Sequence, residues 1–109
     1  MNDLYARVVE MFGIEYQMDL AAEEMAELIK ELIKYKRKHI AAKGVTKYRN
    51  QNEAESLDAV AEEMADVYIV MEEIAQHFGL EPSVAEYKAR KLKKLENNLD
   101  KMDEECAEF

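Results

Sequence analysis

Two stretches of this sequence decide the fold: LAAEEMAELIKELIKYKR at residues 20–37 and AVAEEMADVYIVMEEI at residues 59–74. In both stretches apolar residues recur every three or four positions, which is the period of an amphipathic α-helix. Both also contain the pentapeptide Glu-Glu-Met-Ala followed by an acid, at residues 23–27 and 62–66. We therefore expect two long helices with matching acidic motifs, and antiparallel packing would bring those motifs face to face.

Two further helices are expected outside these stretches. Gly13, Gly44 and Gly79 are placed to end the first three helices, and Ser56 and Ser83 are placed to begin the last two as N-caps. The expected helices cover residues 3–12, 19–43, 56–78 and 82–102, with a polar loop over 45–55 and a fraying acidic tail over 103–109.

The composition agrees with a helical domain. The chain has 109 residues, three glycines and one proline, which are few for a fold made of many tight turns. We predict one all-α domain over residues 1–109, an antiparallel bundle of about four helices. Four helices of this size provide a limited core, and the wide apolar stripes contain several of the seven methionines. We therefore expect oligomerisation to complete the bundle.

Charge and cysteine content exclude several classes of protein. With 24 acids and 15 bases, the formal net charge is −9, which argues against a partner that is a polymeric nucleic acid or an acidic membrane. The single cysteine, Cys106, cannot form an internal disulfide. We find no signal peptide and no apolar run long enough to span a membrane. A cytoplasmic location is the expectation.

The acidic motifs are the feature that carries chemistry. Each contains two acids three residues apart, which lie on one face of a helix and repel each other. The two pairs are Glu24 with Glu27 and Glu63 with Asp66. Apolar residues surround these pairs at helical spacing, and a carboxylate on an apolar face is costly unless it is paired, protonated or bound to a cation. Because the ligands would all be oxygens, we predict a site for Mg²⁺, with Mn²⁺ as a substitute.

Two alternatives remain open for the charged residues. The acids also fit a solvated face, or the role of partners for Lys30, Lys34 and lysines of the last helix. The bases gather at residues 34–49 and 88–94, which suits a polyanionic ligand such as a triphosphate. They also suit the C-terminal ends of helices, where cations complement the helix dipole.

The paired motif resembles a known family. The segments EEMAELIKELIKYKR at 23–37 and AEEMADVYIVMEEI at 61–74 are similar to the EExxE…ExxD signature of MazG-like nucleoside triphosphate pyrophosphohydrolases. These belong to the all-α NTP pyrophosphatase superfamily, with dimeric dUTPases and phosphoribosyl-ATP pyrophosphatases. The resemblance covers roughly residues 13–98. It extends to Gln17 before the first motif, to Lys34 and Arg37 after it, and to KLKKL at 91–95.

The resemblance implies a reaction and a set of roles. The reaction is Mg²⁺-dependent hydrolysis of a (deoxy)nucleoside triphosphate between the α and β phosphates, giving a nucleoside monophosphate and pyrophosphate. The implied metal ligands are Glu24, Glu27, Glu63 and Asp66. Glu23 or Glu62 would orient or deprotonate the attacking water. The implied substrate contacts are Gln17, Lys34, Arg37, Tyr68, Lys91 and Lys94. A homodimer or homotetramer is implied as well.

Some features depart from that family. The chain has no tryptophan to stack on a base, and residues 45–55 contain no recognisable base-reading motif, so the substrate nucleotide is not identified. One alternative is a helical interaction or adaptor protein without enzymatic activity, in which Glu63→Gln changes nothing. Another is the same fold acting on phosphoribosyl-ATP or another nucleotide. Glu73→Gln, on the same helix but outside the motif, is expected to be nearly silent.

Overall fold

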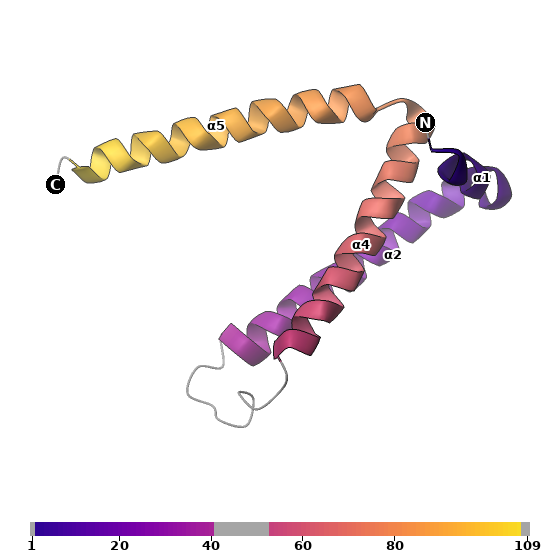
Figure 1. The fold of residues 1–109 in the computed structure, drawn as a ribbon, viewed down its shortest axis with the longest axis horizontal. Helices are drawn as coiled ribbons and strands as arrows, with labels where there is room; N and C mark the ends of the chain where they lie inside the picture. The colour runs from indigo at the N-terminus through magenta and orange to yellow at the C-terminus, as the bar shows by residue number, and fades with distance from the viewer. Residues whose placement is uncertain (1, 41–52, 108–109) are drawn as a thin grey trace.

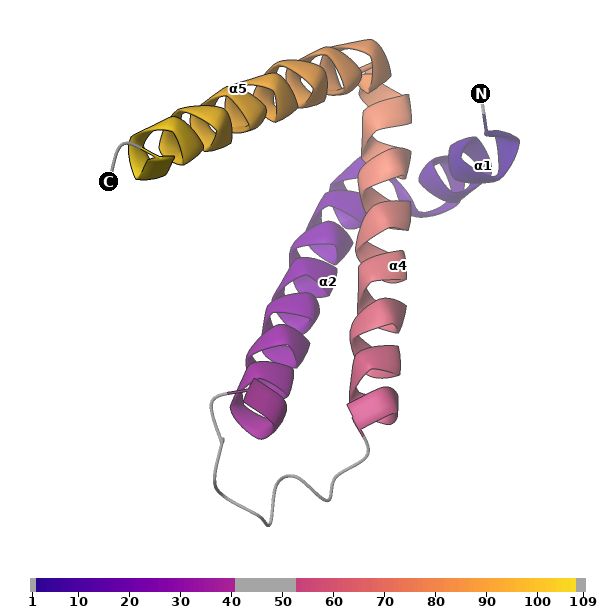
Figure 2. The ribbon, with the colours of Figure 1, turned by 60° about the vertical axis from the view of Figure 1, so that its left-hand side comes forward.

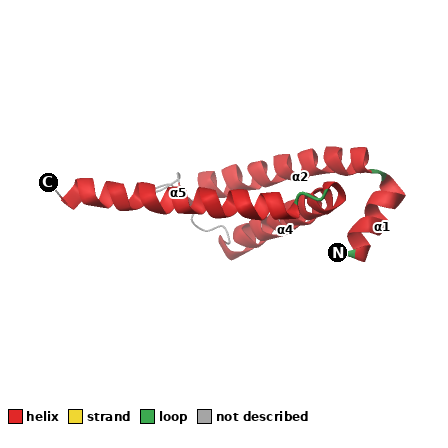
Figure 3. Cartoon of the chain, turned by 90° about the horizontal axis from the view of Figure 1, so that it is seen from above, coloured by secondary structure: helices red, strands yellow, loops and turns green. Residues whose placement is uncertain are grey.

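The protein is all-α, as the sequence predicts. A computed structural model describes residues 2–40 and 53–107, and Figure 3 shows the described part as helices joined by short turns. The elements are α1 (Asp3–Phe12), α2 (Ile14–Tyr35), the π-helical turn η1 (Lys36–Ile40), α4 (Glu53–Phe78) and α5 (Glu81–Ala107). In this part of the chain, no helix has the length and apolar character needed to cross a membrane.

The centre of the fold is an antiparallel pair of helices, α2 and α4, which lie side by side along most of their length (Figures 1 and 2). Helix α1 packs across one end of the pair and contacts both members. Helix α5 leaves α4 at that same end and runs away from the pair (Figure 1). The buried side chains of the described residues all lie between α2 and α4, and they are Gln17, Ala21, Val60, Val67, Val70 and Glu73.

Two glycines make the turns that place α1 and α5. Gly13 has φ +89° and its N–H donates to the carbonyl oxygen of Val9 at 2.7 Å, which ends α1 and lets α2 begin at the next residue. Gly79 has φ +65° after the last residue of α4, and the following N–H of Leu80 donates to Ala75 at 2.8 Å. Side chains rarely tolerate these positive φ values, so glycine is needed at both corners.

Hydrogen bonds fasten α1 to α4. The N–H of Asn2 donates to Gln76 Oε1 at 2.8 Å, and Gln76 Nε2 donates back to the carbonyl oxygen of Asn2 at 2.9 Å. The hydroxyl of Tyr5 donates to Glu72 at 2.5 Å, and this hydrogen bond to an anion raises the pKa of Tyr5. These contacts fix α1 over the end of the helix pair.

The first helix has the predicted bounds, but the starts of the other helices were predicted too late. Helix α2 begins at Ile14 rather than Asp19, because Gly13 alone makes the turn. Helix α4 begins at Glu53, where acids in the first turn complement the helix dipole. Ser56 therefore lies inside the helix, and its Oγ lies 3.1 Å from His39 Nε2 instead of capping the helix.

The two ends of α5 also differ from prediction. It begins at Glu81, which puts Pro82 in the first turn, where a missing N–H costs nothing, and puts Ser83 inside the helix. The helix continues to Ala107, so residues 103–107 do not fray. The predicted stop at Gly44 and residues 45–52 of the predicted loop lie outside the described residues.

The apolar stripe predicted for the second helix does not face α4. Met18, Met25, Ile29 and Leu32 are 41–57% exposed in the single chain. The radius of gyration is 19.2 Å, against roughly 13 Å for a compact domain of this length. A large part of the apolar surface of this chain therefore has no cover within the chain.

Candidate metal centre

Three of the predicted acids converge at the middle of the helix pair. Glu24 comes from α2, and Glu63 and Asp66 come from α4. One carboxylate oxygen from each lies within 4.8 Å of the other two, and all three residues are half-buried. Because Glu63 and Asp66 are three residues apart on one face, the antiparallel packing of α2 brings Glu24 opposite both.

The electrostatics of this acid cluster are unfavourable when all three carboxylates are ionised. Burial, followed by the charges of Asp66 and Glu63, raises the pKa of Glu24 above its usual range. Burial also raises the pKa of Glu63, with the charge of Asp66 next in importance. Glu63 Oε2 is buried and has no hydrogen-bond partner. A buried oxygen in that state costs free energy that a bound ion would recover.

The donor set fits a hard divalent cation. Carboxylate oxygens from Glu24, Glu63 and Asp66 are the ligands that Mg²⁺ and Mn²⁺ prefer, and Zn²⁺ sites usually contain His or Cys. The ion pairs found within residues 2–40 and 53–107 both lie on α5, and they are Arg90 with Glu86 and Lys93 with Glu96. Among these described residues, neither Lys30 nor Lys34 forms an ion pair with Glu24, Glu63 or Asp66.

The other acids of the motif lie around the cluster. Glu27, predicted as a fourth ligand, is exposed and outside the group of three, although its charge contributes to the raised pKa of Glu63. Glu23 and Glu62, predicted as candidates for water activation, are also exposed. Glu62 is close enough that its charge acts on Glu63 as well.

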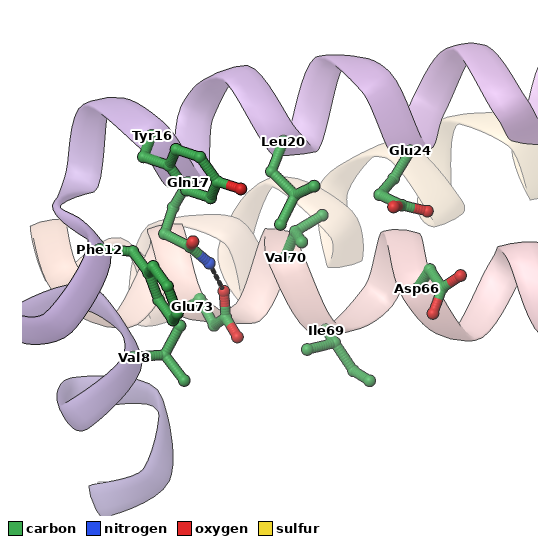
Figure 4. Close-up of a pocket in the computed structure, with 10 residues that line it drawn as sticks. All are labelled: Val8, Phe12, Tyr16, Gln17, Leu20, Glu24, Asp66, Ile69, Val70 and Glu73. Carbon is green, nitrogen blue, oxygen red and sulfur yellow. Dashed lines mark hydrogen bonds between the residues drawn. The ribbon is translucent and has the colours of Figure 1, made fainter.

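A cavity of about 320 Å³ adjoins the acid cluster (Figure 4). Glu24 and Asp66 line one part of it, and Gln17 and Glu73 line another. Gln17 Nε2 donates a hydrogen bond to Glu73 Oε2, and these two side chains are 2% and 5% exposed. The sequence predicted Gln17 as a substrate contact, and the structure puts it in this cavity.

A second cavity, of about 150 Å³, lies farther along the helix pair toward η1. Lys34, a predicted substrate contact, lines it together with Lys38 and Glu31. Arg37, predicted with Lys34, is exposed on η1. At this end of the pair, the hydroxyl of Tyr35 on α2 donates a hydrogen bond to Glu53 on α4. This hydrogen bond raises the pKa of Tyr35.

The three remaining predicted contacts do not meet the acid cluster in this chain. Tyr68 is 58% exposed and lines a groove between α4 and α5, with Lys88 and Val84. Lys91 and Lys94 lie on α5, which extends away from the helix pair (Figures 1 and 2). Within one chain these lysines are not near the acid cluster.

Sequence reasoning missed Glu73 and Glu31. Glu73 follows Asp66 by seven residues, and Glu31 follows Glu24 by seven residues. Seven residues are about two helical turns, so each acid lies on the same face as its motif partner. That spacing puts both acids on the face of the motifs, although it does not by itself tell a buried face from a solvated one. Because Glu73 is buried and hydrogen-bonded, Glu73→Gln does not serve as a silent control.

Comparisons of the chain with protein-family profiles, with curated proteins and with solved structures give no match. The resemblance to MazG-like proteins therefore depends on the motif residues alone, and the function is argued from the chemistry of the site.

Proposed function

We propose that this protein is a Mg²⁺-dependent nucleoside triphosphate pyrophosphohydrolase, which cleaves its substrate between the α and β phosphates. The observation that supports this proposal best is the convergence of Glu24, Glu63 and Asp66 from two helices, with one buried oxygen of Glu63 unpartnered. A solvated acidic face would not bury an unpaired carboxylate oxygen.

Different residues of the chain would bind the cation and activate the water. Glu24, Glu63 and Asp66 would hold the cation, which when bound neutralises phosphate charge and lowers the pKa of water. Glu23 and Glu62 are exposed beside these ligands and are the candidates to orient the attacking water and take its proton. Glu27, which is exposed and outside this group of three, would hold a further cation or its hydration shell.

The two cavities suggest how a triphosphate would lie. The acid cluster is between them, with the larger cavity toward α1 and the smaller one toward η1. Lys34 and Lys38 in the smaller cavity would contact the leaving pyrophosphate, although the acids Glu31 and Glu55 also line this cavity. The nucleoside would then occupy the larger cavity, whose lining contains more apolar side chains.

An assay of pyrophosphate release tests this proposal. Wild-type protein is incubated with each of the eight common NTPs and dNTPs and with phosphoribosyl-ATP, with Mg²⁺ or with EDTA. We expect Mg²⁺-dependent release from at least one common nucleotide. Release from phosphoribosyl-ATP alone would move the proposal to that substrate, and no release from any compound would favour the adaptor alternative.

The protein is also proposed to work as a homo-oligomer, a dimer or a tetramer, in the cytoplasm. All 27 residues of α5 are exposed in the single chain, including a stripe of apolar side chains. The stripe, which we call the α5 apolar face, contains Val84, Leu92, Leu95, Leu99 and Met102. A second copy would cover this face and could bring Lys91 or Lys94 toward an acid cluster. Sedimentation equilibrium measures the assembly mass directly.

A further inference from the structure

We propose that the larger cavity selects nucleotides whose base carries an exocyclic amino group, through the buried pair Gln17 and Glu73. The inference rests on the proposed function, since it assigns the base-binding end of that same site. It concerns residues outside the acidic motifs, and it predicts preference for cytosine, adenine or guanine over uracil, thymine or hypoxanthine.

The position of the pair is the first argument. Gln17 precedes Glu24 by seven residues on α2, and Glu73 follows Asp66 by seven residues on α4. Seven helical residues span about 10 Å. Figure 4 shows the pair at one end of the cavity and Glu24 with Asp66 at the other. A nucleoside whose α phosphate lies beside the acid cluster would therefore point its base toward Gln17 and Glu73.

The walls of the cavity suit a flat ring. Phe12 and Tyr16 lie at the α1 end with ring centroids 5.7 Å apart and an interplanar angle of 26°. They are 59% and 55% exposed, so aromatic surface remains available for stacking. Leu20, Ile69 and Val70 line the stretch between these rings and the acid cluster. The chain has no tryptophan, so Phe12 and Tyr16 are the aromatic side chains of this cavity on which a base would stack.

The chemistry of the pair gives the selectivity. Glu73 accepts a hydrogen bond from Gln17 Nε2 at one carboxylate oxygen, and a carboxylate has lone pairs for further donors. The carboxylate can accept a further hydrogen bond from an amino group of a base. A keto oxygen in the same place would meet the carboxylate of Glu73, which repels it. Cytosine and uracil differ at this group and at the neighbouring ring nitrogen N3, which carries a hydrogen only in uracil; adenine and hypoxanthine differ in the same way at N1.

Matched substrate pairs test the inference on the wild-type protein. We compare kcat/KM for dCTP against dUTP and for dATP against dITP, with Mg²⁺. We expect at least one amino-bearing member to be preferred over its keto partner by about tenfold or more. Equal values in both pairs, or preference for the keto members, would overturn the inference.

Variants locate the effect. Glu73→Gln supplies an amide that can donate to a keto oxygen, so we expect the amino preference to fall to within about threefold. Asp58→Asn removes the same charge from an exposed position of the same helix and should keep the full preference. A folded Glu73→Gln variant with unchanged preference would contradict the assignment to Glu73.

A binding measurement separates this inference from the proposed function. If no nucleotide is hydrolysed, the proposed function fails, and titration calorimetry with dCMP and dUMP on the wild-type protein still decides base selection. Tighter binding of dCMP by about fivefold or more supports the inference, since the same carboxylate reads the base. Equal binding, or no binding of either, overturns it.

Discussion

The helix pair α2/α4 buries polar side chains, whereas the helix α5 exposes apolar ones. Between α2 and α4, the buried or half-buried positions include acids and an amide, among them Glu24, Glu63 and Gln17. On α5, apolar side chains such as Leu95 and Leu99 are more than half exposed. A chain that buried its apolar residues for stability alone would show the reverse arrangement. We therefore propose that the helix pair binds a ligand and that α5 packs against another protein surface.

The largest expected effect comes from the acid cluster. Glu63→Gln keeps the shape of the side chain but removes a charge from the proposed metal site. We expect kcat/KM for the best nucleotide to fall roughly 10³-fold, corresponding to several kcal/mol of lost charge stabilisation. Mn²⁺ binding measured by electron paramagnetic resonance should weaken in parallel. The matched control is Asp58→Asn, which should leave both measurements at wild-type values.

The next effect concerns assembly through the α5 apolar face. Leu95→Glu puts a charge in the middle of this face, and we expect the dimer or tetramer to dissociate to the monomer. Asn97→Glu adds the same charge about 200° around the helix and should keep the assembly intact. Sedimentation equilibrium measures both. A wild-type protein that is already monomeric would contradict the interpretation of α5.

Stability should depend on pH and on the cation together. The pKa values of Glu24 and Glu63 are raised in the folded state, so the folded protein binds protons more tightly than the unfolded chain. Their contribution to the free energy of unfolding therefore falls as pH rises above about 4.5 and through the folded pKa values. Bound Mg²⁺ would offset this loss.

Thermal unfolding at pH 5.0 and 7.5 checks that prediction. At a Mg²⁺ concentration of about 100 times Kd, linkage adds roughly 2.7 kcal/mol, which raises Tm by several degrees. We expect the increase at pH 7.5 to exceed the increase at pH 5.0, where protons compete with the ion. If Mg²⁺ raises the Tm of the Glu63→Gln variant as much as that of the wild-type protein, the ion binds outside the acid cluster.

The smallest effect is local to the buried pair. Gln17→Leu leaves the carboxylate of Glu73 buried without its hydrogen-bond partner. We expect the free energy of unfolding to fall by about 1–3 kcal/mol in urea denaturation. Gln17→Glu would bring a second carboxylate against Glu73 and should destabilise the protein further. A neutral result for both variants would mean that the pair contributes little to packing α2 against α4.

The two regions also differ in how well the sequence predicted them. The apolar residues at helical spacing around Glu63, such as Val60 and Val67, predicted its partly buried position correctly, because the spacing of a helix fixes which residues share a face. The pairing of α2 with α4 follows from the same pattern. Gly13 and Gly79 marked the helix ends because positive φ favours glycine.

What the sequence did not predict depends on contacts between helices. The burial of Glu73 is visible only once α1 and α2 are packed on α4, since its spacing alone does not tell a buried face from a solvated one. Ser83 looked like an N-cap, but α5 begins at Glu81, one residue earlier than expected, with Pro82 in its first turn. The direction of α5 depends on the turn at Gly79.

The central claim is that the acid cluster between α2 and α4 hydrolyses a nucleoside triphosphate at the α phosphorus. Phosphorus-31 NMR of the products, with wild-type protein, Mg²⁺ and the nucleotide that reacts fastest, tests it most directly. We predict signals of a nucleoside monophosphate and pyrophosphate that grow together and that EDTA abolishes. A nucleoside diphosphate with inorganic phosphate, or no product with any nucleotide, would contradict the account.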